Sequence, residues 1–338
     1  MKKFLSHFLV ATFLFFSNAC QNAVLGPQEE DFQSLIQVIV KVEGHMRRLS
    51  QDLKVIGEHH QLLLEKRDSI LAHPGPFKYT IEGNFSTNKP GEDRTLSTII
   101  LLNSSKDREK GKELILITNS LDSLFANYIS NHPEVVQIFS NSALQASRIY
   151  PAFDAKNIVD PNIDITSFNF YYEADFAHNP SKGTVWLPDA YIDPAGKGWI
   201  FSLVYPIYEE EELSAVMGID LPIGEAIGSF LESEEGYFVL VNQKGDIIGG
   251  TSEGIKLLDM PVLRNHVYRE SIEENNFRDP DFNLSRSKNA EVRDMAKAIL
   301  ENKKVHYDFK QDPRLFRALG VKFSNVDWFL LELKLADQ

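Results

Sequence analysis

The sequence predicts an α+β fold in which one long N-terminal helix is followed by two smaller units of mixed helix and strand. Apolar residues recur every three or four positions over 29–71, as on one face of an amphipathic helix. After residue 76 the apolar segments become short and are separated by polar turns, and this pattern begins again at Gly236. A chain of 338 residues is long enough for about two such units.

The composition excludes some classes of protein. With 43% hydrophobic and 11% aromatic residues, the chain does not have the composition of an intrinsically disordered protein. Its net charge of −13 repels phosphate backbones, so we expect no nucleic-acid partner. Cys20 is the only cysteine, so neither an intramolecular disulfide nor a cysteine-based metal cluster can form.

Residues 1–20 have the features of a signal peptide. Lys2 and Lys3 precede an apolar run over 4–16, which is too short to span a bilayer. Small residues and then Cys20 end the segment, which resembles the lipobox of bacterial lipoproteins. We therefore expect Cys20 to carry a lipid that anchors the exported chain in the cell envelope, facing the periplasm or the exterior. Simple secretion and an uncleaved anchor are the alternatives, and no later apolar run is long enough to cross a membrane.

The predicted helix extends over 29–71 as one continuous element, and its segment ends at the proline-rich stretch 73–76. At 1.5 Å per residue it would be about 65 Å long, enough to pack along both later units. We expect a kink at Gly44, if the helix bends at all. The apolar positions are Phe32, Leu35, Ile36, Ile39, Val42, Met46, Leu49, Leu53, Ile56, Leu63 and Ile70.

The first unit is predicted to span 77–232. Its helices are expected from Asn119 or Ser120 to Pro133 and over 222–231, and 151–180 is rich in loops and aromatic residues. Strands are expected over 77–85, 96–102, 135–139, 184–186, 199–207 and 213–221, with a short apolar segment at 114–117.

The second unit is predicted to span 233–338. It begins with a hairpin in which residues 237–241 and 246–248 flank a turn at Gln243–Gly245. Helices are expected over 259–269 and 290–301, and the closing strands over 306–309, 315–323 and 328–333.

A series of short motifs in this order resembles the bacterial double Cache sensor domains, from about residue 30 to the end of the chain. The motifs are Phe125, Pro133–Gln137, Arg148–Pro151, Phe170–Asp175, Thr184–Trp186, Tyr191–Gly196, Pro206–Tyr208 and a Gly-x-Asp strand at Val216–Asp220. The resemblance implies two PAS-like antiparallel sheets on a helical spine. It also implies that 77–232 is the membrane-distal, ligand-binding domain and 233–338 the membrane-proximal one.

The resemblance implies a function as well. Family members typically continue into a kinase, cyclase or methyl-accepting domain, whereas this chain ends at Gln338, shortly after its last predicted strand. We therefore expect a sensor module without an output domain of its own, which passes occupancy to a membrane signalling partner.

Amino-acid-binding double Cache domains hold their ligand with aromatic residues, an arginine and two aspartates. Aromatic faces and carboxylates together suit a cationic ammonium group. Asn169 stands where the family has its arginine, so an amine fits better than a free amino acid. The alternative is that the aromatic residues belong to the core and that Asp193 begins a turn. The candidate ligand-binding residues are Tyr171, Tyr172, Trp186, Tyr191, Asp193 and Asp220.

The residue patterns give less support to other functions. Arg148 could approach a ligand carboxylate, but we expect it to form a structural salt bridge. The acidic run 209–212 is expected to be a solvated hairpin tip, and no H-E-x-x-H pattern is present, so we expect no metal and no cofactor. No G-x-S-x-G motif is present, and we expect no enzyme. The remaining alternatives are a structural or interaction lipoprotein whose Cache pocket binds nothing and a carboxylate-based hydrolase.

Overall fold

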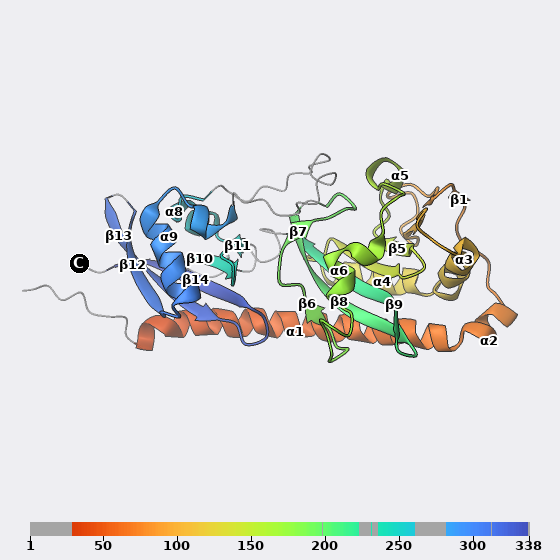
Figure 1. Ribbon diagram of the computed structural model, residues 1–338, viewed down its shortest axis with the longest axis horizontal. Helices are drawn as coiled ribbons and strands as arrows, with labels where there is room; N and C mark the ends of the chain where they lie inside the picture. The colour runs from red at the N-terminus through yellow and green to blue at the C-terminus, as the bar shows by residue number, and fades with distance from the viewer. Residues whose placement is uncertain are drawn as a thin grey trace, which may run out of the picture.

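The computed structural model describes residues 29–197, 199–222, 231, 236–260, 282–311 and 313–336. A long helix extends along one side of the molecule, and two antiparallel sheets pack on it one after the other (Figure 1). The predicted fold class is therefore confirmed. Cys20 and the rest of the predicted signal peptide lie outside the described residues, as do most of the helices predicted over 222–231 and 259–269. No helix in the described ranges is both long and apolar enough to cross a membrane.

The spine consists of α1 (Glu29–Glu65) and the short α2 (Arg67–Ala72), separated by a turn at Lys66. The helix was predicted to be continuous to residue 71. It is interrupted one turn earlier, at Lys66, and α2 beyond this turn buries none of its residues, so little apolar packing stabilises the last stretch of the spine. The buried apolar positions of α1 repeat at helical spacing from Leu35 to Ile56. Gly57 allows close approach to the first sheet, because a Cβ there would lie 2.2 Å from Tyr205 Cδ1.

The first sheet has the order β1-β2-β3-β5-β4-β9-β8-β6, with β7 paired to β8, and every pairing is antiparallel. One face packs on α1, α3 (Arg108–Ile117) and α4 (Leu121–Asn131). A segment over 151–172 covers the other face and contains α5 (Ala155–Ile158), η1 (Ile165–Ser167) and α6 (Asn169–Tyr172). The strands are β1 (Ile81–Glu82), β2 (Phe85–Ser86), β3 (Thr98–Leu101), β4 (Gln137–Ser142), β5 (Ala146–Tyr150), β6 (Val185–Trp186), β7 (Tyr191–Ile192), β8 (Trp199–Glu209) and β9 (Glu212–Pro222).

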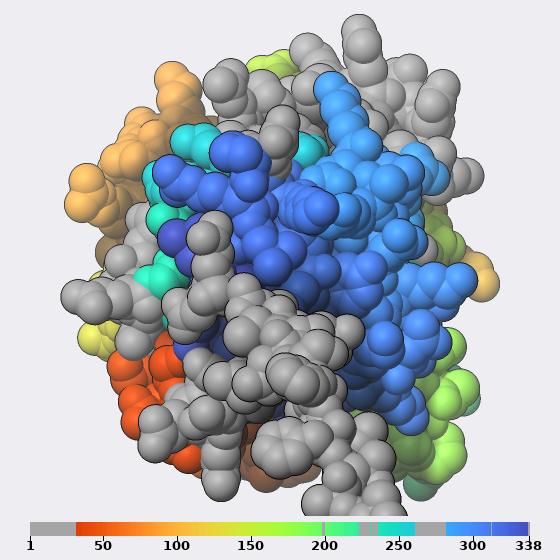
Figure 2. All heavy atoms as spheres, turned by 90° about the vertical axis from the view of Figure 1, so that its left-hand side faces the viewer, coloured from red at the N-terminus to blue at the C-terminus, as the bar shows by residue number. Residues whose placement is uncertain are grey.

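The second sheet has the order β11-β10-β14-β13-β12 and is also antiparallel throughout. Its helical elements form a separate core on the face away from α1. Figure 2 views the end of the molecule at which this sheet lies beside the start of α1, where Ser34 Oγ donates a hydrogen bond to Glu332 Oε2 at 3.1 Å. The elements are β10 (Tyr237–Asn242), β11 (Ile247–Gly250), α8 (Ser252–Leu257), η3 (Leu284–Arg286), α9 (Ala290–Ala296), the π-helical η4 (Lys297–Glu301), β12 (His306–Gln311), β13 (Arg314–Lys322) and β14 (Trp328–Leu335).

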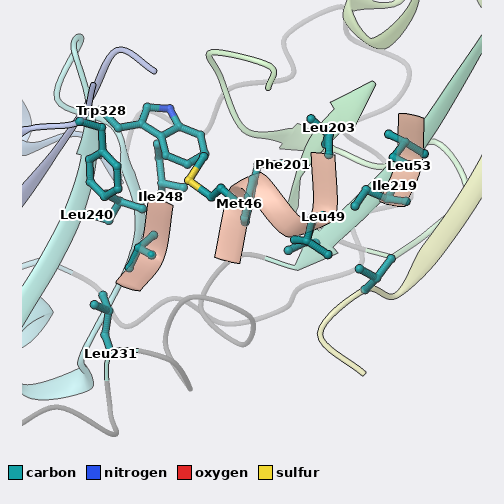
Figure 3. Packing of buried hydrophobic residues seen from close by; sticks show 14 of the residues in the cluster. Met46, Leu49, Leu53, Phe201, Leu203, Ile219, Leu231, Leu240, Ile248 and Trp328 are labelled. Carbon is teal, nitrogen blue, oxygen red and sulfur yellow. The ribbon is translucent and has the colours of Figure 1, made fainter. Parts of the chain in front are cut away.

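One continuous apolar core joins the spine helix to both sheets (Figure 3). Met46 and Leu49 of α1 lie where Phe201 of the first sheet meets Trp328 of the second. The rings of Phe201 and Trp328 are 5.5 Å apart, and Trp186 packs 6.3 Å from Trp328. The two sheets are therefore held to each other as well as to the helix.

Some predicted elements differ from the observed ones. The single strand predicted over 77–85 is wrong, because Gly83, with φ of 61°, turns the chain between β1 and β2. The apolar segment 114–117 is the last turn of α3, and β5 was not predicted as a strand although its residues carried the resemblance. The polar and charged residues of β5 are buried by tertiary contacts, and this burial cannot be recognised from local periodicity.

Candidate functional site

A cavity of about 50 Å³ lies on the face of the first sheet that is turned away from α1. Strands β3, β4, β5 and β9 form its floor, and residues of the covering segment and of the turn after β7 enclose it. The lining residues are Ile100, Leu102, Gln137, Phe139, Asn141, Ser147, Ile149, Val159, Ile163, Ile165, Phe170, Tyr191, Asp193, Pro194, Ala195 and Asp220. Three of the six predicted ligand-binding residues, Tyr191, Asp193 and Asp220, are therefore brought together.

The alternation of side chains along each strand decides which residues reach this cavity. On β4, Gln137 and Phe139 face it, while Ile138 packs in the core under α1. On β9, Gly218 lies opposite Phe139 and two positions before Asp220. A Cβ at Gly218 would lie 2.2 Å from Phe139 Cζ, so the glycine gives the ring room to lie across the sheet. The Gly-x-Asp motif thus provides both a space for an aromatic ring and a carboxylate.

Both aspartates are buried and accept hydrogen bonds from uncharged groups. Asp220 accepts from Ser202 Oγ at 2.5 Å and from Gln137 Nε2 at 2.8 Å. Asp193 accepts from the backbone nitrogens of Ala195 at 2.9 Å and Lys197 at 3.0 Å, within the turn that follows β7. The expected turn at Asp193 is therefore present, and it places the carboxylate at the cavity. Within the described part of the chain, neither aspartate forms an ion pair.

Burial without a cation changes the protonation of these groups. Loss of solvation raises the pKa of Asp193 from 3.8 to about 6, and the nearby Lys197 ammonium opposes this only in part. The pKa of Asp220 is raised well above its ordinary value, first by burial and then by the negative charge of Asp193. Burial and Asp220 also raise the pKa of Tyr191, whose hydroxyl lies 2.8 Å from Ser202 Oγ. Perturbed carboxylates at a cavity are typical of functional sites.

Aromatic rings form the wall beside the carboxylates. The ring centroids of Phe139 and Phe170 are 5.6 Å apart, and those of Phe170 and Tyr191 are 6.2 Å apart. A cation held by the aspartates could also contact these ring faces. No lysine or arginine side chain is among the lining residues that the structure describes.

The other three predicted residues lie outside the cavity. Tyr171 is buried in the adjacent core and donates a hydrogen bond to the carbonyl of Leu213 at 2.9 Å. Tyr172 is 39% exposed and packs on His178 at the surface. Trp186 packs on Trp328 and lines a different hollow, of about 540 Å³, beside α1. The structure thus places Tyr171 and Trp186 in packed surroundings and Tyr172 at the surface.

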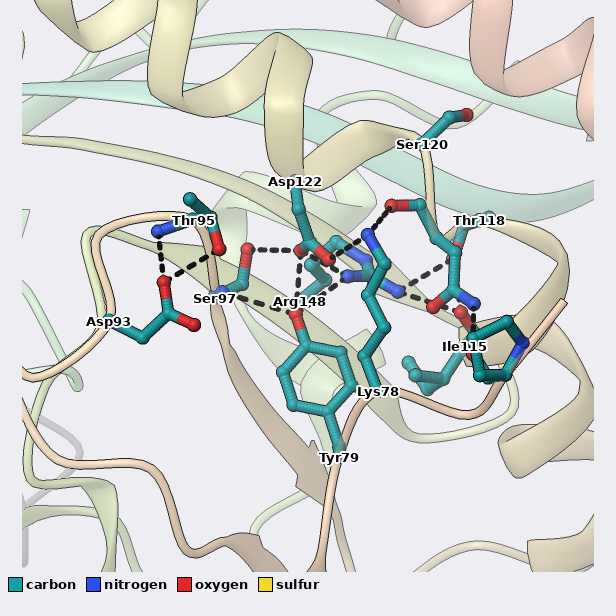
Figure 4. A network of polar contacts seen from close by, with 12 residues as sticks. Lys78, Tyr79, Asp93, Thr95, Ser97, Ile115, Thr118, Ser120, Asp122 and Arg148 are labelled. Atoms are coloured by element: carbon teal, nitrogen blue, oxygen red, sulfur yellow. Dashed lines mark hydrogen bonds and ion pairs between the residues drawn. The ribbon is translucent and has the colours of Figure 1, made fainter.

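Arg148 lies on the opposite face of the sheet, as the central group of a buried network (Figure 4). It forms a salt bridge with Asp122 and donates to Tyr79 Oη at 3.0 Å and to the Ile115 carbonyl at 2.7 Å. Its neighbours on β5, Ser147 and Ile149, point the other way and line the cavity. The expected structural salt bridge is thus observed.

Sequence reasoning did not select several residues of the site. Gln137 belonged to a quoted motif but was not a candidate, and neither were Phe139, Phe170 and Ser202. Gln137 and Asn141 stand four positions apart on β4, and therefore on the same face of the strand, which was an available signal. No group of three or more histidine, cysteine, aspartate or glutamate side chains in the described ranges is arranged to hold a metal ion.

No family model matches the sequence, and no curated protein matches it. Several solved structures resemble the chain at low identity. The ligand-binding domain of the Campylobacter jejuni chemoreceptor Tlp3 in complex with 4-methylisoleucine has a TM-score of 0.48 and 12% identity, over 91% of this chain and 90% of that one. The ligand-binding domain of Mlp24 with asparagine has a TM-score of 0.44 and 12% identity, over 90% and 94%.

A third structure, the ligand-binding domain of the Pseudomonas fluorescens chemoreceptor CtaA in complex with L-alanine, has a TM-score of 0.44 and 13% identity, over 68% of this chain and 86% of that one. In the present chain, the strand orders and the continuous core define the architecture directly. Two antiparallel sheets packed on one long helix are the arrangement that the resemblance to double Cache sensor domains implied.

Proposed function

We propose that this chain is an exported ligand-binding sensor protein that recognises a small organic ammonium ion in the cavity of its first sheet. The observation that carries the proposal is the pair Asp193 and Asp220, two buried carboxylates at one cavity that form no ion pair among the described residues. Burying ionised carboxylates is costly unless a cation pairs with them. An ammonium ion would supply the missing charge, and the aromatic wall would stabilise it further.

An amine fits the site better than an amino acid. The position that the family uses for an arginine, Asn169, lies outside the cavity and accepts a hydrogen bond from the nitrogen of Phe170. Arg148 is committed to Asp122 on the far face. The α-carboxylate of a bound amino acid would therefore lie near two aspartates, with no lysine or arginine among the described lining residues to neutralise it.

The segment 186–193 offers a route by which occupancy could reach the second sheet. It brings Asp193 to the cavity, and four residues earlier its Asp189 carboxylate lies 2.7 Å from Lys244 Nζ in the turn between β10 and β11. Movement of the cavity wall would thus displace Asp189 and, through its ion pair with Lys244, the hairpin of the second sheet. With the chain anchored through Cys20, this sheet would lie nearer the membrane, where a signalling partner would detect the change.

The proposal is tested by a thermal-shift screen that pairs each amine with its parent amino acid. A ligand at about 100 times its dissociation constant stabilises the folded state by about 2.7 kcal/mol. The amine should raise the melting temperature more than the amino acid, and Asp220→Asn should abolish the effect. Asn at 220 keeps the size of the side chain, and the Ser202 hydroxyl and Gln137 amide can reorient to satisfy it.

The outcomes separate the candidates. If amino acids stabilise the protein more than their amines, the ligand class is wrong. If neither class shifts the melting temperature, a structural or interaction lipoprotein becomes the better interpretation. Hydrogen exchange on a bound complex tests the route, since protection should increase in β10 and β11, and Lys244→Ala should remove that increase while leaving the affinity in place.

A further inference from the structure

Gln137 lines the cavity with the two carboxylates, and its carbonyl oxygen has no hydrogen-bond partner within the described part of the chain. The side chain is 2% exposed, and its amide nitrogen donates to Asp220 Oδ2 at 2.8 Å. An ammonium ligand would keep both carboxylates ionised, a form in which they only accept hydrogen bonds, so in the bound state the amide nitrogen of Gln137 faces Asp220, as it does in the structure. Gln137 Oε1 is buried and lacks a hydrogen-bond partner among the described residues. Leaving a buried acceptor unpaired is unfavourable, so this atom is suited to receive a donor from a ligand.

We infer that the site selects primary ammonium ions over more highly substituted ones, with Asp193, Asp220 and Gln137 Oε1 as the three acceptors. This inference rests on the proposed function, and it narrows the ligand class. A primary ammonium carries three N–H donors, which matches one donor to each acceptor. Each added N-methyl group removes a donor and would place carbon against an acceptor, leaving that acceptor unsatisfied.

The aromatic wall alone would give a different preference. Phe139, Phe170 and Tyr191 could surround a methylated ammonium through cation–π attraction, which needs no N–H donor. Here the three acceptors are on the strand floor and at the turn, where an N-methyl group would take the place of an N–H donor. The polar groups therefore decide the selectivity, and the rings contribute affinity.

Matched pairs of ions test this inference at constant charge and size. Isopropylammonium and trimethylammonium have the same number of heavy atoms, as do tert-butylammonium and tetramethylammonium, but the members differ in N–H donors. Calorimetric titration, with methylammonium as the smallest probe, should give at least about tenfold tighter binding for the primary member of each pair. Gln137→Met keeps the length of the side chain without its carbonyl, and the ratio within each pair should fall toward one. Ser140→Ala, on the same strand but facing His60, should leave the ratio unchanged.

Each outcome bears on one of the two proposals. Equal or tighter binding of trimethylammonium or tetramethylammonium would overturn the inference and leave the proposed function standing. An unchanged ratio in Gln137→Met would overturn the role of Gln137. If no ammonium ion binds at millimolar concentration, the inference and the proposed function are both rejected. The wild-type ratio is informative by itself, even where the variant does not fold.

Discussion

The buried charge of Asp193 should be measurable as a dependence of stability on pH. Because its pKa is raised from 3.8 to about 6, the folded state keeps a proton that the unfolded state releases between these values. The free energy of unfolding contributed by this group is therefore retained at low pH and lost as pH rises through that window. The difference between the two pKa values corresponds to on the order of 3 kcal/mol.

The Asp193→Asn variant isolates this contribution. Asparagine does not titrate, so the free energy of unfolding of the variant minus that of the wild type should rise by on the order of 3 kcal/mol between about pH 4 and pH 7.5. Taking the difference cancels groups whose titration does not depend on Asp193, such as buried His60, whose pKa is lowered to about 3 and whose contribution has the opposite sign. The part of the raised Asp220 pKa that comes from the charge of Asp193 is lost in the variant and belongs to the measured difference. The lost hydrogen bonds from Ala195 and Lys197 shift the variant by a constant amount and leave the slope unaffected.

Urea denaturation followed by circular dichroism at stepped pH would provide these values. The exposed Asp68, on α2, provides the matched control, and Asp68→Asn should give a flat difference across the range. The variant-minus-wild-type free energy of unfolding could instead stay constant for Asp193→Asn, or fall as pH rises. Either result would refute the conclusion that Asp193 is a buried carboxylate that forms no ion pair. A saturating amine should reverse the trend, because it binds the ionised form.

Three further changes have defined outcomes. Gly218→Ala should destabilise the protein by about 1–3 kcal/mol and weaken amine binding, since its Cβ would collide with the Phe139 ring; wild-type behaviour in denaturation and titration would contradict this close packing. Arg148→Met should lower the free energy of unfolding by up to about 3–5 kcal/mol, since buried Asp122 would keep only the partly exposed Lys78 ammonium, 3.5 Å away, as a cation; a loss of ligand binding at unchanged stability would instead place Arg148 in the site. Cys20→Ser should release the mature chain from the membrane fraction, and retention there would count against lipidation.

The sequence by itself determined the order and type of most elements. The apolar spacing from Leu35 to Ile56 could form only an amphipathic helix, and β8, β9 and the closing strands were apparent from their apolar runs. Tyr191, Asp193 and Asp220 were singled out because their motifs resemble those of amino-acid-binding double Cache domains. These features are local, so periodicity and motif order suffice to find them.

Only the tertiary structure decided which side chains share a cavity. Strand β4 lies between β5 and β9, and this pairing brings Gln137 beside Asp220 across 83 positions of sequence. The same pairing sends Arg148 to the helix-covered face, where Asp122 neutralises it. Trp186 has the same aromatic character as Tyr191, yet packing against the second sheet removes it from the site. The physical reason is that each strand alternates its faces, so register and sheet order, which depend on long-range contacts, determine what each residue meets.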